Sequence, residues 1–208
     1  MSVDPKIKPV MGPKIKVDTG GSDWRALSIN DSDQARLRAL EKARTLFRSK
    51  TFNPKVDDIE DVTTGMTMNE RRLFSNGELV YSGGLGNCVG IVMLEKGTGK
   101  AIASHSIFHG ATNDAREMAK VAQALFSKSK VEIFLCGNDV RDVHSEQNTT
   151  PGEECKRLRR EIYDALTKEF GFKHSQVKAE WGKAGHTTGY FLDVEVGKIK
   201  VFQERNEN

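Results

Sequence analysis

The chain has 208 residues, 37% of them hydrophobic and 29% charged, which suits one folded domain with an appendage or two small domains and excludes an intrinsically disordered chain. Its 32 basic and 29 acidic residues leave a net charge of +3 without the clustered basic excess of a dedicated nucleic-acid-binding protein, so no nucleic-acid partner is expected. No apolar run reaches the roughly 18 residues of a membrane span and no secretory signal follows the N-terminus, so we expect a cytoplasmic protein or one secreted without a cleavable signal peptide.

The first part of the chain is predicted to lie outside the main domain. Residues 1–22 combine Pro, Gly and Lys with little apolar periodicity, which is typical of a disordered tail. Residues 23–65 are predicted to form an N-terminal extension with one helix over 31–48, where apolar residues recur at helical spacing. Residues 66–208 then form the folded domain that carries the function.

The folded domain begins with β-strand patterns. A short strand is predicted from Gly77 onward, and the continuous apolar run Val89–Leu94 predicts a strand buried on both faces. The turn-rich stretch Glu95–Lys100 separates it from the strand Ala101–Phe108, which predicts a β-hairpin. A helix over 112–127 follows, since apolar residues recur there at helical spacing.

The second half of the domain mixes strand and helix signals. Residues Val131–Cys136 predict a buried strand, 139–150 a polar loop, and 151–170 a helix that Thr150 caps and Pro151 begins. Further strands are predicted at Gln176–Trp181, Tyr190–Val196 and Lys198–Phe202. Two helices among mostly hairpin-linked strands favour an α+β layered fold over a βαβ-wound sheet.

A glycine-rich stretch, Tyr81–Gly90 (YSGGLGNCVG), is the most informative part of the sequence, because glycines let backbone N–H groups approach a ligand closely. A dinucleotide-binding loop is rejected, since Val89 stands where a third glycine is required and a strand follows instead of a helix. A phosphate-binding P-loop around Lys100 is rejected as well, because Ala101 replaces the required Ser or Thr. The remaining interpretation is an oxyanion-binding turn with a nucleophile at its end.

Cys88 supplies that nucleophile, and the hairpin supplies a base. If the turn centres near Gly97, position 88 lies opposite 105–107, so His105 is opposite Cys88 or one diagonal step away. A nearby imidazole can take the thiol proton, and a thiolate–imidazolium pair would lower the cysteine pKa. His109 shares the strand parity of His105 and is a rival base. The loop residues whose N–H groups would stabilise the oxyanion are Gly84, Gly86 and Asn87.

Structural roles stay open for both residues. A cysteine before a buried strand is usually a small core residue, and a strand histidine is usually held structurally. The three cysteines, Cys88, Cys136 and Cys155, are too few for a disulfide framework, so a reducing compartment is expected. No CxxC, HExxH or paired Cys/His spacing occurs, so neither a metal site nor a cofactor is expected.

Residues 82–89 (SGGLGNCV) resemble the nucleophile loop of the CheD family of chemoreceptor glutamine deamidases, which shares its fold and catalytic pair with cytotoxic necrotizing factor toxins. The CheD pattern runs from a hydroxyl residue through Leu-Gly-Leu-Gly-Ser-Cys to an apolar strand, a turn and an Ala-His strand. His105 stands where the catalytic His of the family is expected, and Ser82 where the family carries a Thr that orients it. The similarity covers roughly residues 75–203. Asn87 in place of a small Ser and the polar loop 139–150 depart from the pattern and bear on the substrate more than on the reaction.

The resemblance implies a layered α/β/β sandwich with two packed helices, and makes 66–208 a deamidase-like catalytic domain. It implies that Cys88 attacks an exposed glutamine carboxamide on a protein substrate, that His105 takes the thiol proton and protonates the departing ammonia, and that Ser82 orients His105. Water then hydrolyses the thioester to leave glutamate. An amine in place of water would give transglutamination.

The biological role of such a deamidase remains open, and so do other functional classes for the protein. A secreted effector or toxin and a chemoreceptor-type deamidase in bacterial signalling use the same site. A catalytically silent interaction module would keep the fold and bind a partner, and a small-molecule amidase or cysteine peptidase would need a deep closed pocket. Trp181 and His186 are candidates for lining the entrance, and the oligomeric state is not predicted.

Overall fold

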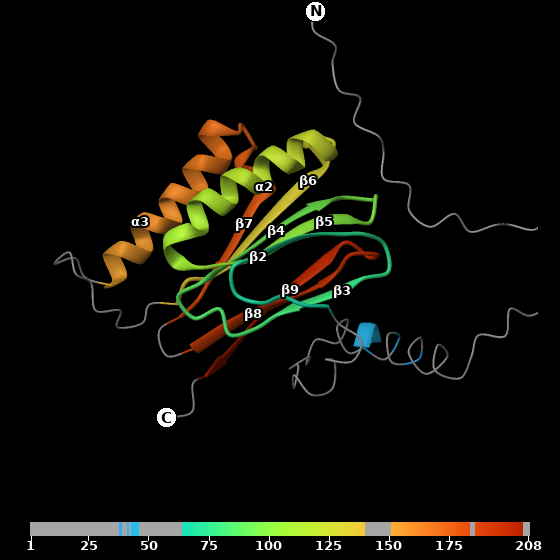
Figure 1. Cartoon of the computed structure of the whole chain (residues 1–208), viewed down its shortest axis with the longest axis horizontal. Helices are drawn as coiled ribbons and strands as arrows, with labels where there is room; N and C mark the ends of the chain where they lie inside the picture. The colour runs from blue at the N-terminus through green and yellow to red at the C-terminus, as the bar shows by residue number, and fades with distance from the viewer. Residues whose placement is uncertain are drawn as a thin grey trace, which may run out of the picture.

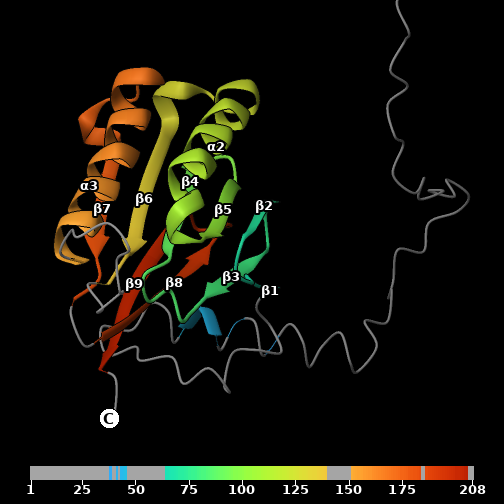
Figure 2. The ribbon, with the colours of Figure 1, turned by 60° about the vertical axis from the view of Figure 1, so that its left-hand side comes forward.

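The computed structural model describes residues 38, 41, 43–45, 64–139, 151–183 and 186–205. The described residues form a mixed α+β fold of two sheets and two helices stacked in three layers (Figures 1 and 2), so the predicted α/β/β sandwich is confirmed. The predicted tail, most of the predicted helix over 31–48 and nearly all of the predicted loop 139–150 lie outside the described residues.

The central layer is a five-stranded sheet in the order β2-β5-β4-β6-β7. Its strands are β2 (Glu70–Phe74), β4 (Val89–Glu95), β5 (Lys100–Ser106), β6 (Val131–Gly137) and β7 (Val177–Trp181). The pairs β2–β5, β5–β4 and β4–β6 are antiparallel, whereas β6 and β7 pair parallel. A parallel pair needs a long crossover, which the second helix provides.

The second sheet has four strands in the order β1-β3-β8-β9. They are β1 (Thr64–Gly65), β3 (Leu79–Ser82), β8 (His186–Asp193) and β9 (Lys198–Arg205). The β8–β9 hairpin turns at Gly197, whose φ of 67° is a conformation that glycine adopts without strain. The predicted hairpin around Gly197 is therefore confirmed, although β8 begins four residues before the predicted start at Tyr190.

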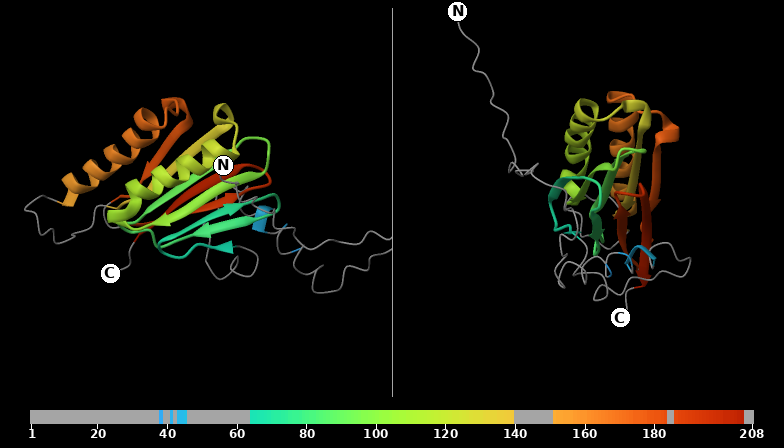
Figure 3. Two further views of the ribbon diagram at one scale, coloured as in Figure 1. Left: turned by 45° about the horizontal axis from the view of Figure 1, so that its top comes forward. Right: turned by 90° about the vertical axis from the view of Figure 1, so that its right-hand side faces the viewer.

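Two helices cover one face of the central sheet, and the second sheet packs on the other face (Figure 3). They are α2 (Ala111–Leu125) and α3 (Pro151–Asp164), and α3 continues into a π-helical turn at Ala165–Glu169. The apolar face of α2 packs with Ile91, Met93 and Ile133 of the sheet. None of the helices among the described residues is long and apolar enough to cross a bilayer.

A second core fills the space between the two sheets, and it positions the candidate site. Because side chains alternate along a strand, β4 and β5 send one set of residues to the helices and the other set into this inter-sheet core. The buried members include Val92, Ala103, Cys136, Tyr190 and Cys88. The nucleophile predicted from the sequence therefore lies between the sheets, at the start of β4.

Strand β2 and the parallel β6–β7 pair were not predicted from the sequence. In β2 (ERRLF) only Phe74 is buried, so the strand lacks the alternation of apolar and polar residues that marks a half-buried strand. It forms an edge of the sheet and pairs only with β5 among the described strands.

Candidate active site

The β4–β5 hairpin brings Cys88 and His105 to one face of the central sheet. Gly90 pairs with His105 and Val89 with Ser106, so Cys88 continues the strand to a position opposite Ile107. The predicted hairpin register is confirmed, and His105 lies one diagonal step from Cys88. Diagonal neighbours of this kind are separated by about 7–8 Å between Cα atoms. Both side chains face the inter-sheet core, where they are 8% and 6% exposed.

Gly90, which pairs with His105, leaves room for neighbouring side chains that a larger residue would displace. A Cβ atom at this position would lie 2.7 Å from Cys136 Sγ and 2.8 Å from the Tyr190 ring, closer than packed atoms approach. Cys136 faces Gly90 from β6 and His105 faces it from β5, so the glycine lies between them in one row across the sheet. Because Gly90 has no side chain, the Tyr190 ring can lie over it.

A hydrogen bond between the two sheets orients His105. Ser82 Oγ on β3 lies 3.1 Å from His105 Nδ1, and the serine is fully buried. The sequence predicted that Ser82 orients His105, and the structure brings the two together. Tyr190 is paired with Ser82 across β3 and β8, and its hydroxyl donates to the backbone carbonyl of Ser104 at 3.2 Å.

The Ser82 contact can hold the proton of His105 on Nδ1. The Tyr190 hydroxyl donates its proton to the Ser104 carbonyl, which can only accept. Ser82 Oγ carries lone pairs that can accept the N–H of His105 Nδ1. In that tautomer the neutral imidazole presents an unprotonated Nε2, which is the nitrogen that a general base needs.

Burial keeps the resting pair neutral. Desolvation raises the pKa of the Cys88 thiol above its ordinary value and lowers the pKa of His105 below 6.5. In the described part of the chain, Cys88 Sγ makes no hydrogen bond to His105. The lowered cysteine pKa that the sequence suggested for a thiolate–imidazolium pair is therefore wrong for this state, because burial shifts both pKa values toward the neutral forms.

The three predicted oxyanion donors, the N–H groups of Gly84, Gly86 and Asn87, bond to no acceptor among the described residues. Gly84 and Gly86 adopt φ values of 64° and 49°, which turn successive peptide planes in the way that anion-binding loops require. The Cys88 N–H donates to the Leu85 carbonyl at 2.5 Å and is therefore already bonded. The N–H groups of Gly86 and Asn87 make no such bond within the described ranges and are left to bind an oxyanion.

The turn that follows β6 holds this loop through three hydrogen bonds. Asn138 donates its backbone N–H to the Cys88 carbonyl at 2.6 Å and its side-chain amide to the Asn87 carbonyl at 3.3 Å. Asp139 donates its N–H to the Gly86 carbonyl at 2.6 Å. In a trans peptide the C=O of one residue and the N–H of the next point in opposite directions, so the bond to the Gly86 carbonyl turns the Asn87 N–H away from Asp139.

Three further residues that the sequence singled out have the following places in the structure. His109 is not on β5, which ends at Ser106, but in the 3-10 turn Phe108–Gly110, so its predicted strand parity with His105 is wrong. Trp181 ends β7 and lies under the guanidinium of Arg159, 5.1 Å from ring centroid to Cζ. His186 begins β8 and pairs with Arg205 at the far end of the hairpin.

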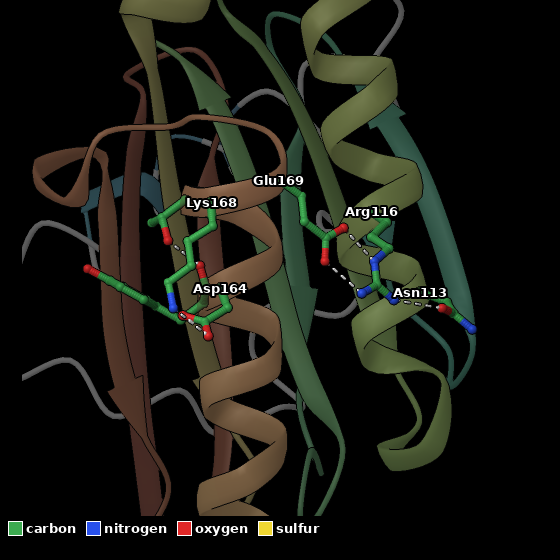
Figure 4. A network of polar contacts seen from close by, with 7 residues as sticks. Asn113, Arg116, Asp164, Lys168 and Glu169 are labelled. Atoms are coloured by element: carbon green, nitrogen blue, oxygen red, sulfur yellow. Dashed lines mark hydrogen bonds and ion pairs between the residues drawn. The ribbon is translucent and has the colours of Figure 1, made fainter.

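Two clefts in the described part of the chain lie away from Cys88. One, of about 420 Å³, runs between α2 and α3, and the other, of about 300 Å³, lies between β2 and α2. In the first cleft Arg116 forms a two-pronged ion pair with Glu169, with both distances 2.8 Å, beside the Lys168–Asp164 pair (Figure 4). Neither cleft is lined by Cys88, His105 or Ser82, and no cluster of three metal-ligating side chains occurs in the described ranges.

Sequence reasoning missed the roles of Tyr190 and Asn138. Tyr190 carried only a strand signal, because its contacts with Ser82 and Ser104 come from other strands. A signal for Asn138 was present: a Gly-Asn pair directly after a buried strand predicts a turn with positive φ, and Gly137 and Asn138 adopt φ values of 83° and 53°.

Comparisons with known proteins identify no family for this chain. No family model and no curated protein matches it. Among solved structures, the hypothetical protein YfiH of Bacillus licheniformis superposes with a TM-score of 0.37 at 9% identity, over 53% of this chain and 50% of that one. YlmD of Geobacillus stearothermophilus superposes with a TM-score of 0.39 at 14% identity, over 66% of this chain and 61% of that one. This chain thus spans half to three-fifths of those proteins, and similarity this weak carries no conclusion about activity.

Proposed function

We propose that this protein is a cysteine-dependent amidase that converts glutamine side chains of a protein substrate into glutamate. The observation that carries the proposal is the buried Ser82–His105 hydrogen bond at 3.1 Å, on the sheet face that also bears Cys88. We assign the proton of the neutral imidazole to Nδ1, with Ser82 Oγ as its acceptor, which leaves Nε2 of His105 unprotonated. The resemblance of residues 82–89 to the CheD nucleophile loop supports the same chemistry.

The reaction starts from a neutral pair. As Cys88 Sγ attacks the carboxamide carbon, its proton moves to His105 Nε2, so the imidazole acts as a general base during attack. The carboxamide oxygen becomes an oxyanion that the N–H groups of Gly86 and Asn87 stabilise, each worth roughly 3–4 kcal/mol in known cases. His105 then returns the proton to the amide nitrogen, the C–N bond breaks and ammonia leaves a thioester on Cys88.

Water completes the cycle. His105 takes a proton from water, the hydroxide attacks the thioester carbon, and the C–S bond breaks to release glutamate and restore the thiol of Cys88. The proton held by His105 returns to sulfur. An amine in place of water would transfer the acyl group to that amine, so the nucleophile that reaches the thioester decides between deamidation and transglutamination.

The test measures ammonia release and the mass change of glutamine to glutamate on glutamine-bearing proteins. We expect activity in the wild type, none in Cys88→Ser or His105→Ala, and retained activity in His174→Ala, which removes an exposed imidazole that bonds to Tyr163 away from the proposed site. Circular dichroism of each variant checks the fold. Activity that persists in folded Cys88→Ser would overturn the proposal.

A catalytically silent binding module is a second candidate, and the burial of the pair favours it. Cys88 and His105 are 8% and 6% exposed, and the loop must move or bind its substrate closely for a carboxamide to reach Sγ. A binding module would hold its partner equally well when Cys88 is replaced by serine. Wild type without ammonia release, with partner binding unchanged in Cys88→Ser, selects this candidate.

A further inference from the structure

Asn138 uses all of its polar groups to connect the Cys88 loop to the rest of the protein. Its N–H and side-chain amide hold the Cys88 and Asn87 carbonyls, as described above. Its side-chain oxygen accepts from Arg159 Nε at 3.0 Å, and its backbone carbonyl accepts from Arg159 Nη2 at 2.5 Å. The residue is fully buried, so no water replaces any of these bonds.

Arg159 is itself fixed from several sides. It extends from α3, donates a further hydrogen bond to the Gly182 carbonyl at 3.4 Å, and stacks its guanidinium on the Trp181 ring. Desolvation lowers its pKa, and the carbonyl and amide oxygens around the guanidinium offset part of this cost. A planar group held in this way has one orientation, and it transmits that orientation to Asn138.

We propose that Asn138 and Arg159 are positioning residues for the nucleophile loop, an inference that rests on the amidase function proposed above. Asn138 holds the carbonyls of Asn87 and Cys88, so it fixes the two peptide planes on either side of the Cys88 Cα. Arg159 fixes the rotamer of Asn138. Neither residue contacts the substrate; both act through the orientation of the peptide planes next to Cys88.

The positive φ of Asn138 suggests the sharpest variant. Asn138→Gly tolerates the φ of 53° and keeps the two backbone hydrogen bonds, but it loses the side-chain bonds to Asn87 and Arg159. Arg159→Met removes the guanidinium while keeping a long apolar side chain over Trp181. Arg160→Met is the matched control, because Arg160 is the next residue of α3 and is exposed.

Two measurements on the full-length protein report on the loop: the alkylation of Cys88 and the kcat for ammonia release. Iodoacetamide alkylation of Cys88 is followed by peptide mass spectrometry, with the fully buried Cys136 as an internal standard for global unfolding. We expect Cys88 alkylation to rise several-fold in Asn138→Gly and Arg159→Met, since a loosened loop exposes the thiol, while Cys136 stays protected. The kcat for ammonia release should fall roughly 10- to 100-fold with KM little changed, because misplaced groups lose transition-state contacts. Arg160→Met should match the wild type in both readouts.

The two readouts separate failure of this inference from failure of the amidase proposal. If the wild type releases no ammonia but Cys88 alkylation still responds to Asn138→Gly, the positioning role stands and the amidase proposal falls. Cys88 alkylation and kcat that match the wild type in Asn138→Gly overturn the positioning role. A parallel rise at Cys136 also overturns it, because the change is then global. Asn138→Gly decides the matter if Arg159→Met does not fold.

Discussion

Replacing Ser82 with alanine removes the hydroxyl on which the orientation of His105 depends. The buried Nδ1–H then loses its acceptor, and no solvent reaches it because Ser82 is fully buried and His105 is 6% exposed. An unsatisfied buried donor costs about 1–3 kcal/mol, so the free energy of unfolding should fall by roughly that amount in urea titrations. Without this acceptor, the tautomer of His105 with its proton on Nδ1 is no longer favoured over the other.

Stability alone does not test this reasoning, so a matched variant is needed. Ser104→Ala breaks the buried hydroxyl pair between Ser104 and Ser106, which lies 2.9 Å apart on the same strand as His105, and should cost a similar amount. Only Ser82→Ala should move the imidazole nitrogen chemical shifts of His105 from those of the Nδ1–H tautomer toward those of a mixture of tautomers. Only this variant should also lose ammonia release. Unchanged nitrogen shifts in Ser82→Ala would show that Ser82 does not fix the tautomer and would refute the argument.

Three further predictions follow from buried groups around the site. Gly90→Ala should lower the free energy of unfolding by about 1–3 kcal/mol, since its Cβ would meet Cys136 Sγ at 2.7 Å; a urea midpoint equal to that of the wild type would contradict this packing. Burial lowers the folded-state pKa of His105 below 6.5, so the unfolded chain binds that proton first. The free energy of unfolding should therefore fall as pH drops below 6.5 toward the folded-state value, and His105→Gln should remove this slope from pH-dependent denaturation. Because burial raises the pKa of Cys88, its alkylation rate should become half-maximal above pH 9.0 in the free protein, and a midpoint in the neutral range would instead indicate a stabilised thiolate.

The parts of the fold with local signals were predictable from the sequence. The apolar run Val89–Leu94 and the turn near Gly97 were enough to predict the β4–β5 hairpin and its register, because the register of a hairpin follows from its turn. The same reasoning brought Cys88 and His105 to one face. The helix over 112–127 followed from apolar spacing alone and matches α2 within two residues at each end.

The parts that depend on distant partners were not predictable. The edge strand β2 buries only Phe74 and so shows no pattern of its own. The hydroxyl of Tyr190 matters because it donates to a carbonyl 86 residues away, and no local pattern encodes that contact. The neutral state of Cys88 and His105 was missed for the same reason, since their desolvation comes from the second sheet and the loops around it.

The bond between Ser82 and His105 joins two sheets that form from different parts of the chain, which has a consequence for the order of folding. The β4–β5 hairpin is local and can form early, so Cys88 and His105 meet before the second sheet is in place. The pairing of Ser82 with Tyr190 closes a loop of more than a hundred residues and therefore comes late. A partly folded chain thus carries an exposed thiol next to an imidazole whose tautomer is not yet fixed. We therefore expect Cys88 to be most readily oxidised or alkylated during refolding and synthesis. Its exposure should fall once the second sheet packs on the first.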